Sequence, residues 1–508
     1  MRVLLVRPPS VLGRMARQNL QHPTNLLGLA AELRSRGHAA ALLDLEVDPR
    51  GVPAFQRSLL EWRPDVVGLS VVTPHVPAAR DLALLARLTR PELFLIAGGP
   101  HATALPADLL GEVPALDAVC VGEGDRTVPE LCDALAGLRA GAGSDAEARE
   151  EALAAVPGLM LRGRGFTGHR EPLMDLDALA PIDRALLDWP AYEALAGHKG
   201  VASPGVIRKG IRATQIHLSR GCYARCVFCS TNAVWGERAR PGIRRRSVAS
   251  ALEEIDRVRA DFGVNHVNFE DDTFPPTLHF LEELCAGLVE RRQRARAARH
   301  TPLTWSCNAR VDGLRREHFE LMAAAGCVKI DFGVESGSER ILELNQKLVR
   351  REQVVHVFAE ARRAGILRTA YLMLGSHVDE TPAEVEQTAA LAREIRPDYI
   401  TFTVACPYPG TALWEECKRR GYLELLPSGR PDWKRYGYYP GLPPWRFTHF
   451  TPEQMLATQQ RFLRRFYLRP GFVVRQLAGV RSADHLAALV TAGMDVRSFL
   501  RGSRGSGG

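Results

Sequence analysis

Short apolar runs alternate with helical patterns along the first part of the chain. Runs rich in Val, Leu and Ile, separated by helices of about ten residues, are typical of a parallel sheet that helices cover on both faces. The pattern therefore predicts a doubly wound, Rossmann-like α/β domain, whose ligand binds beyond the carboxyl ends of the strands. The expected strands are Val3–Val6, Ala40–Leu43, Val66–Ser70, Leu93–Ala97 and Ala118–Val121, and the expected helices are Leu26–Arg36, Gln56–Trp62 and Ala78–Leu88.

A second alternation of strands and helices begins near Gly210. Strand and helix units that repeat in this way predict a partial (β/α)6 barrel, in which the chemistry gathers on loops at the carboxyl ends of the strands. Polar residues that follow each strand are therefore the candidate site residues. The expected strands are Thr214–Leu218, His266–Phe269, Leu303–Asn308, Val328–Phe332, Arg368–Leu374 and Tyr399–Val404.

With 508 residues the chain is too long for a single core, and its pattern divides it into four parts. Residues 1–138 form the first domain, and residues 139–205 form a linker with a small strand pair. Residues 206–421 form the barrel, and residues 422–508 form a C-terminal region of Pro-rich loop and helices. This last region either closes the mouth of the barrel or only packs against it.

The composition, 46% hydrophobic and 24% charged, is that of an ordinary globular protein. No apolar segment reaches the roughly 18 residues that a membrane span requires, and the N-terminus lacks the features of a signal peptide. We therefore expect a cytoplasmic protein without a membrane span. The net charge of +8 reflects arginine runs such as 244–246 and 291–292, which we expect on solvated faces because no nucleic-acid motif accompanies them.

Three of the ten cysteines, Cys222, Cys226 and Cys229, form a CxxxCxxC run directly after the first barrel strand. Thiolates favour iron-sulfur clusters or zinc. Structural zinc sites and electron-transfer clusters normally have four protein ligands, so three thiolates leave one coordination position for another molecule. A zinc site completed by a distant His217 remains the alternative. The other cysteines are scattered and are expected to be core thiols.

The cysteine run resembles the cluster loop of the radical S-adenosylmethionine (SAM) superfamily, which carries CxxxCx(aromatic)C, with Phe228 as the aromatic residue here. The resemblance implies a four-iron four-sulfur (4Fe-4S) cluster on the three cysteines, whose remaining iron binds the methionine moiety of SAM. It also implies reductive cleavage of SAM to a 5'-deoxyadenosyl radical that abstracts hydrogen from a small-molecule substrate. The electron would come from an external one-electron reductant such as flavodoxin or ferredoxin.

Polar residues at the ends of the barrel strands are the candidate SAM contacts. Asp271 and Asp272 follow the second strand and suit an ammonium group, although a helix cap before Pro275 would also explain them. Arg310 follows the third strand and either binds the SAM carboxylate or pairs with Asp312. The run 333–337 resembles the Gly-x-Glu-Ser-Gly run of a radical SAM subfamily. The remaining candidates are Asn308, Glu335, Ser336 and Leu374.

Glycines and hydroxyl residues follow the strands of the first domain, where they either admit a large flat ligand or only make tight turns. With Pro8-Pro9 after the first strand, the GGPHAT run at 98–103 and the GEGD run at 122–125, the domain resembles the cobalamin-binding domain that precedes a radical SAM barrel in one subfamily. The candidate cobalamin contacts are Ser70, Thr73, Gly98, Gly99, His101, Gly122, Glu123 and Gly124.

The family signature Asp-x-His-x-x-Gly, whose His binds cobalt, is absent, because Arg7–Ser10 occupies its place; His75 and His101 remain candidate ligands. The whole chain resembles the cobalamin-dependent, class B radical SAM methyltransferases. This resemblance implies methyl transfer from methylcobalamin to an unactivated carbon or a phosphinate phosphorus. A radical cyclisation, oxidation or ring rearrangement without methyl transfer is one alternative, and a non-catalytic cobalamin carrier or sensor is another.

Overall fold

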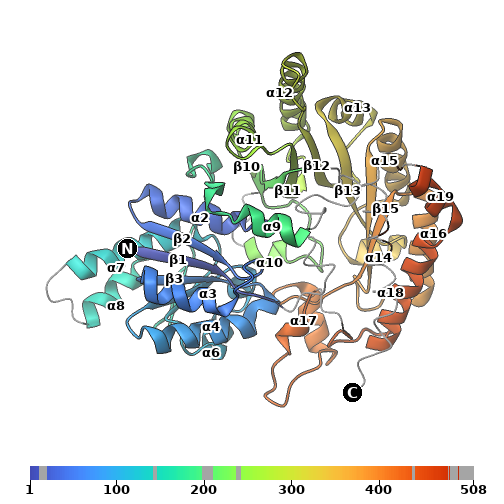
Figure 1. The fold of residues 1–508 in the computed structure, drawn as a ribbon. Helices are drawn as coiled ribbons and strands as arrows, with labels where there is room; N and C mark the ends of the chain where they lie inside the picture. Colours follow the sequence, from blue (N-terminus) through green and yellow to red (C-terminus); the bar gives the residue numbers. More distant parts are fainter. Residues whose placement is uncertain are drawn as a thin grey trace.

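The computed structural model describes residues 1–10, 20–140, 146–196, 210–235, 242–437 and 441–478, together with residues 480, 490 and 493. Two sheets with their helices form two bodies that lie side by side, with α9 (Trp189–Ala196) and α10 (Thr231–Trp235) between them in Figure 1. The first body is built from the N-terminal third of the chain, and the second carries the cysteine run.

The first sheet has, within the described residues, seven strands in the order β2-β1-β3-β4-β5-β6-β7, of which the first five are parallel. Alternate residues of β1 face two different cores: Leu4 and Val6 belong to one and Val3 and Leu5 to the other. Helices therefore cover both faces, which confirms the predicted doubly wound fold. The parallel strands are β1 (Arg2–Arg7), β2 (Ala39–Asp44), β3 (Val66–Ser70), β4 (Phe94–Gly98) and β5 (Ala118–Cys120).

The helices of this body follow the strands in chain order. They are α2 (Thr24–Ser35), α3 (Val52–Arg57), η1 (Ser58–Trp62), η2 (Thr73–His75), α4 (Val76–Thr89), α5 (Pro100–Ala104), α6 (Pro106–Glu112), α7 (Gly124–Ala140) and α8 (Ala146–Ala154). The strand pair predicted in the linker, β6 (Leu159–Leu161) and β7 (Gly165–Phe166), pairs antiparallel with β5 and so extends the first sheet. Two short helices, η3 (Leu176–Ala178) and η4 (Arg184–Leu186), lead to α9.

The second sheet has, among the described residues, six parallel strands in the order β15-β14-β13-β12-β11-β8. They are β8 (Ala213–Ile216), β11 (His266–Phe274), β12 (Thr304–Arg310), β13 (Cys327–Glu335), β14 (Leu367–Leu374) and β15 (Tyr399–Val404). The curved sheet is the predicted partial barrel. Three strands, β11, β12 and β13, run further than expected, to Phe274, Arg310 and Glu335.

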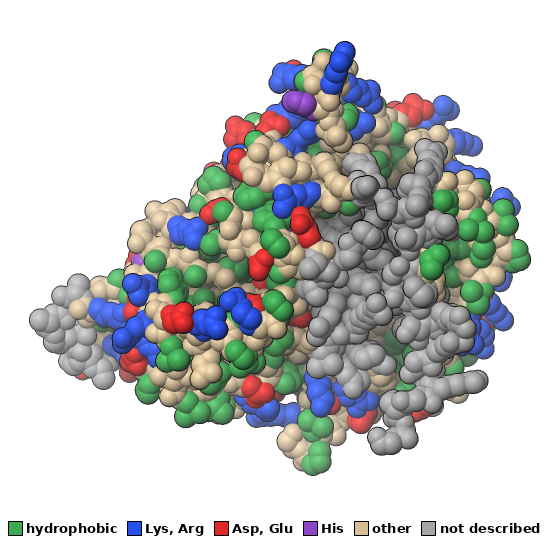
Figure 2. All heavy atoms as spheres, in the orientation of Figure 1, with side chains coloured by type: hydrophobic (Ala, Val, Ile, Leu, Met, Phe, Trp, Pro, Cys, Tyr) green, Lys and Arg blue, Asp and Glu red, His purple; other side chains and the backbone are tan. Residues whose placement is uncertain are grey.

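Helices cover the outer face of this sheet. They are α11 (Val248–Phe262), α12 (Leu278–Ala297), α13 (Arg316–Ala325), α15 (Arg351–Arg363) and α16 (Pro382–Ile395). Helices α14 (Glu339–Leu344) and α17 (Ala412–Arg419) lie instead next to the cysteine run, where Val227 donates to Asn345 at 3.2 Å and accepts the Leu413 amide at 3.0 Å. A two-stranded antiparallel ribbon, β9 (Ser219–Arg220) with β10 (Arg244–Arg245), stands beside the cysteine run. Figure 2 shows Lys and Arg side chains gathered over α12. Neither arginine run lies wholly on a solvated face as predicted, because Arg244 is buried and Arg291 and Arg292 are half-buried.

The C-terminal region packs on both bodies. Its η5 (Trp433–Arg435) contacts the first domain, and Trp433 lies edge-on to His101, with ring centroids 4.9 Å apart. Its α18 (Pro452–Tyr467) covers the last barrel strand, where Phe462 stacks on Phe402 at 3.9 Å, and α19 (Pro470–Ala478) follows. The helices therefore pack beside the barrel. No helix among the described residues is long and apolar enough to cross a bilayer.

Candidate functional site

The cysteine loop (Cys222–Cys229) leaves β9 through Gly221, whose φ of 95° lies in the left-handed region. A Cβ at Gly221 would lie 2.9 Å from the carbonyl oxygen of Gly242, so a glycine is required where the two chain segments cross. All three cysteines are free thiols; Cys226 is buried, and the other two are half-buried. The Cys222 Sγ lies 2.9 Å from the hydroxyl of Thr273. The loop thus presents three thiols at the carboxyl ends of the barrel strands.

The thiols fit an iron-sulfur cluster better than a single zinc ion. No three His, Cys, Asp or Glu side chains within the described ranges converge closely enough to bind one ion, whereas a cluster spreads its thiolates over separate irons. Burial raises the pKa of Cys226, and the neighbouring cations Lys347 and Arg310 oppose that rise. Such cations favour the thiolates that a cluster needs. His217, the candidate fourth zinc ligand, lies instead 3.1 Å from the hydroxyl of Thr24.

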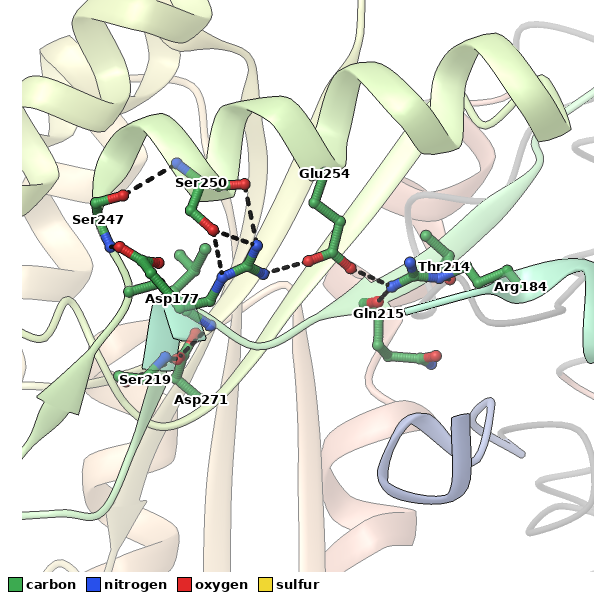
Figure 3. Close-up of polar contacts among 11 residues, drawn as sticks. Asp177, Arg184, Thr214, Gln215, Ser219, Ser247, Ser250, Glu254 and Asp271 are labelled. Carbon is green, nitrogen blue, oxygen red and sulfur yellow. Dashed lines mark hydrogen bonds and ion pairs between the residues drawn. The ribbon is translucent and has the colours of Figure 1, made fainter. Parts of the chain in front are cut away.

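Asp271 anchors the residues before the loop and is not free to bind a ligand through its bonded oxygen. Its Oδ1 accepts hydrogen bonds from the amides of Leu218 (2.9 Å) and Ser219 (2.5 Å) and from the Ser219 hydroxyl (2.7 Å; Figure 3). Burial raises the pKa of this carboxyl to about 7. Its other oxygen, Oδ2, is buried without a hydrogen-bond partner among the described residues, so the ammonium contact of Asp271 stays a prediction. The predicted helix cap was wrong, because Thr277 caps α12.

Asp272 and Arg310 also hold the loop. Asp272 accepts the Gly221 amide at 2.9 Å and the Thr231 hydroxyl at 3.1 Å. Arg310 pairs with Asp312 at 2.8 Å, which is the alternative to binding the SAM carboxylate. Its guanidinium also lies 5.0 Å from the centroid of the Tyr223 ring, inside the cysteine loop. Both side chains thus connect the loop to neighbouring barrel strands.

The remaining predicted SAM contacts differ in accessibility. Glu335 pairs with Lys347 at 3.0 Å, next to the cysteine loop, with a left-handed φ of 66°. Asn308 donates to Glu270 at 2.9 Å. Ser336 is fully buried, and its hydroxyl lies 3.3 Å from that of Thr388, so it belongs to the packing between β13 and α16. Leu374 is also fully buried, and Phe228 packs against the main core. For Ser336 and Leu374 the predicted cofactor contact is therefore corrected.

Besides the predicted Asn308, the barrel interior contains side chains that the sequence did not single out. Hydrophobic residues such as Phe332 and Phe402 face the helices, so the alternate positions of the same strands face inward. Several of these inward side chains are half-buried or exposed, namely Glu270, Asn308, Tyr371, Met373, Thr401 and Thr403. Burial raises the pKa of Glu270 to about 7. This polar interior is suited to a small molecule with hydrogen-bonding groups.

The two candidate cobalt ligands of the first domain, His75 and His101, both have hydrogen-bond partners in the protein. His75 contacts the Ser70 carbonyl oxygen (3.2 Å) with one ring nitrogen and Glu46 (3.1 Å) with the other. The His101 Nδ1 lies 3.3 Å from the Thr73 hydroxyl, and burial lowers the pKa of this imidazole to about 4. His75 therefore has no ring nitrogen for cobalt. Ser70 is more accessible, and its hydroxyl accepts from the amide of Asn25 at 3.2 Å.

The glycines divide between chain crossings and open positions. A Cβ at Gly99 would lie 2.9 Å from the Val71 carbonyl oxygen, so the tight-turn alternative explains this glycine. Gly98 packs on Cys120, and Gly122 borders open space with φ of 82°. Gly124 begins α7. These positions line the carboxyl ends of the parallel strands, where the fold class places a ligand.

Glu123 binds two arginines of the barrel and not a ligand. Its carboxylate pairs with Arg220 and Arg244, each at 2.8 Å, and accepts the Leu173 amide at 3.1 Å. The predicted cobalamin contact at this residue is therefore corrected. The partners lie 97 and 121 residues away along the chain, so no local signal could have identified them.

Two family models match the chain. Residues 14–132 match the B12 binding domain, and residues 216–420 match the radical SAM superfamily. The chain belongs to the cobalamin-dependent radical SAM enzymes. The family membership confirms the predicted cofactors, which are cobalamin, SAM and a 4Fe-4S cluster.

Relatives of this cobalamin-dependent radical SAM enzyme align over most of its length. An uncharacterized methyltransferase of Pyrococcus horikoshii is 29% identical and covers 94% of this chain and 95% of its own. Cytidylyl-2-hydroxyethylphosphonate methyltransferase of Streptomyces wedmorensis is 28% identical and covers 83% of each chain. The anaerobic magnesium-protoporphyrin IX monomethyl ester cyclase of Rubrivivax gelatinosus is 25% identical and covers 82% of this chain and 70% of its own.

Solved structures share the fold of this cobalamin-dependent radical SAM enzyme. The methyltransferase TsrM of Kitasatospora setae, with cobalamin and a 4Fe-4S cluster bound, has a TM-score of 0.64 at 21% identity over 84% of this chain and 79% of its own. The radical enzyme OxsB, with aqua-cobalamin and SAM bound, has a TM-score of 0.67 at 16% identity over 98% of this chain and 71% of its own. Both resemblances concern the arrangement of the two domains.

Proposed function

We propose that this enzyme transfers a methyl group from methylcobalamin to an unactivated carbon or a phosphinate phosphorus of a small molecule. The observation that carries the proposal is the direct contact between the GEGD run of the cobalamin-binding domain and the residue two before Cys222, through Glu123 and Arg220. This contact supports an arrangement in which both cofactors reach one substrate. The relatives named as methyltransferases support the same reaction.

When bound, the cofactors supply the hydrogen-abstracting radical and the methyl group, and the protein supplies position and shielding. Cys222, Cys226 and Cys229 would hold the cluster, with Lys347 beside Cys226 to offset its negative charge. Gly98, Gly122 and Ser70 would meet cobalamin at the strand ends. Asp272 and Glu335 keep the SAM contacts proposed for them as well as their observed bonds.

The barrel interior would bind the substrate. Glu270, with its pKa near 7, both donates and accepts hydrogen bonds at neutral pH, and Asn308 orients its carboxyl group. The exposed Tyr371 hydroxyl lies 3.3 Å from Asp331 and faces the same interior. Such groups favour a substrate with hydroxyl, amino or phosphoryl groups over a pure hydrocarbon.

The first test is the visible spectrum of protein purified without oxygen from cells supplied with cobalamin. A variant with alanine at Cys222, Cys226 and Cys229 serves as the comparison. We expect cobalamin bands in both proteins and a broad iron-sulfur absorbance that only the variant lacks. An iron-sulfur signal without cobalamin would exclude methyl transfer from methylcobalamin.

Product mass then separates the reactions. Methylation adds one CH2 unit to the substrate, whereas the cyclisation suggested by the cyclase relative does not. A carrier or sensor would form no 5'-deoxyadenosine under reducing conditions. An external one-electron reductant, a cytoplasmic location and the absence of a nucleic-acid partner stay predictions from the sequence.

A further inference from the structure

Four charged side chains form an interdomain ion cluster, namely Glu123 and Asp125 of the first domain with Arg220 and Arg244 of the barrel. Arg220 pairs with Glu123 and Asp125, each at 2.8 Å. Arg244, whose side chain is 2% exposed, reaches Glu123 from the other side at 2.8 Å. Glu123 is itself only 12% exposed. Among these residues Glu123 is the carboxylate that binds both arginines.

The two arginines belong to the support of the cysteine loop. Arg220 and Arg244 are opposite each other in the β9–β10 ribbon, and Cys222 follows β9 after Gly221 alone. The stem of the cysteine loop, residues 218–221, is therefore bound to the cobalamin-binding domain by the carboxylates of Glu123 and Asp125, of which Glu123 holds both arginines. A shift of either arginine would move the first cluster ligand.

The barrel binds the other side of the same stem. Asp271 accepts the amides of residues 218 and 219, and the amide of Arg246 donates to the carbonyl oxygen of Leu218 at 2.9 Å. Arg246 in turn pairs with Glu254, which also binds Arg184 of the linker at 2.8 Å (Figure 3). Glu123 is thus the counterpart, on the cobalamin side, of the carboxylates that anchor the stem in the barrel.

We infer that Glu123 is a positioning residue that fixes the cysteine loop, and with it the cluster, relative to the cobalamin-binding domain. This inference rests on the proposed two-cofactor function. Reactions between groups on separate domains depend on their alignment, and a misplacement of about 1 Å can reduce a rate about a hundredfold. A buried charge pair is suited to this role, because loss of one partner leaves the other charge uncompensated.

The test compares Glu123→Gln with a matched control, Asp117→Asn. Asp117 also pairs with an arginine at 2.8 Å, Arg87, but both of its partners lie inside the first domain. In the reconstituted holoenzyme, the electron paramagnetic resonance spectrum reports the spin–spin interaction between the reduced cluster and cob(II)alamin. In Glu123→Gln we expect this spin–spin interaction to be weaker, or its signal broader, than in the wild type. In Asp117→Asn we expect it to be unchanged.

Turnover gives the second measurement. We expect Glu123→Gln to keep forming 5'-deoxyadenosine while methylated product per 5'-deoxyadenosine falls roughly tenfold or more. Glu123→Asp retains the negative charge, so its methylated product per 5'-deoxyadenosine should lie between those of the wild type and Glu123→Gln. This variant also provides the test if Glu123→Gln does not fold. Because Glu123 and Arg220 share one ion pair, the effects of Glu123→Gln and Arg220→Gln should be less than additive in the double variant.

Three results would overturn the inference: an unchanged spin–spin interaction in Glu123→Gln, an equal change in Asp117→Asn, or additive effects in the double variant. Failure of the proposed function has a different signature. A wild-type enzyme that forms 5'-deoxyadenosine but no methylated product refutes methyl transfer, while the spin–spin interaction still decides the role of Glu123. A wild-type protein that binds no cobalamin refutes both.

Discussion

Replacing Asp271 by alanine should loosen the stem of the cysteine loop. One oxygen of this carboxylate accepts the amides of Leu218 and Ser219 and the Ser219 hydroxyl, and the residue is 5% exposed. In the variant both amides lose their acceptor in a region from which water is largely excluded. The perturbation therefore acts on the chain segment that precedes the first cluster ligand.

The magnitude follows from the two amides. A buried donor left without an acceptor costs about 1–3 kcal/mol, so the pair costs about 2–6 kcal/mol. Entry of water into the space left by the carboxylate would keep the loss near the lower end of this range. Since about 1.4 kcal/mol corresponds to a factor of ten, the lower end of about 2 kcal/mol makes opening of the stem about thirtyfold more frequent.

Native-state hydrogen exchange of the apo-protein, followed by mass spectrometry of peptides that contain residues 218–219, measures this opening. Asp256→Ala is the control, because Asp256 is half exposed and its ion pair with Arg291 on the surface is worth about 0–1 kcal/mol. Faster exchange of the stem peptide in Asp271→Ala alone is expected. Unchanged exchange would refute the assignment of Asp271 as the anchor of the stem.

Three further predictions concern stability, measured by unfolding of the apo-protein. Burial raises the pKa of Glu380 from 4.5 to about 8, so the folded protein keeps a proton that the unfolded chain releases. Between these pH values Glu380 should lower the free energy of unfolding by at most about 1.4 kcal/mol per pH unit as pH rises. Glu380→Gln should remove this contribution, which is best separated from those of Glu270 and Asp271 above pH 7. Gly337→Ala should lower the free energy of unfolding by about 1–3 kcal/mol, because its Cβ would lie 2.5 Å from the carbonyl oxygen of Gln387. Gly137→Ala is the control: its Cβ would have no atom within 4 Å apart from the adjacent backbone of its own helix, so no loss of stability is expected. Glu254→Gln should cost about 3–5 kcal/mol, since it leaves the buried Arg184 without its carboxylate partner; a loss below about 1 kcal/mol would contradict this.

The alternation of apolar runs predicted the strands of both sheets because those strands are buried on at least one face by helices. The expected strand Val3–Val6 lies within β1 (Arg2–Arg7), and Tyr399–Val404 is β15. The end of β11 was placed at Phe269 but lies at Phe274. Hydrophobicity stops at Phe269 while the strand does not, because Asp271, Asp272 and Thr273 use their polar side chains to bind the cysteine loop and the residues before it.

The cysteine triad could be predicted because its spacing carries the chemistry within a few residues. Glu123, Arg220 and Arg244 could not be assigned in the same way, since a buried ion cluster depends on partners that only the tertiary fold brings together. Glycines were ambiguous for a related reason. Gly99 is required by the backbone of Val71, which lies on a neighbouring strand end, and no property of the GGPHAT run itself reveals that contact.

The strand pair β6 and β7 determines where this chain can be cut. A fragment ending at residue 138 would remove Leu159 and Leu161 from the second hydrophobic core and leave β5, paired with β4 alone, as an exposed edge strand. Exposed edges of this kind template aggregation. Separate production of the cobalamin-binding half should therefore succeed only when the fragment continues beyond Phe166.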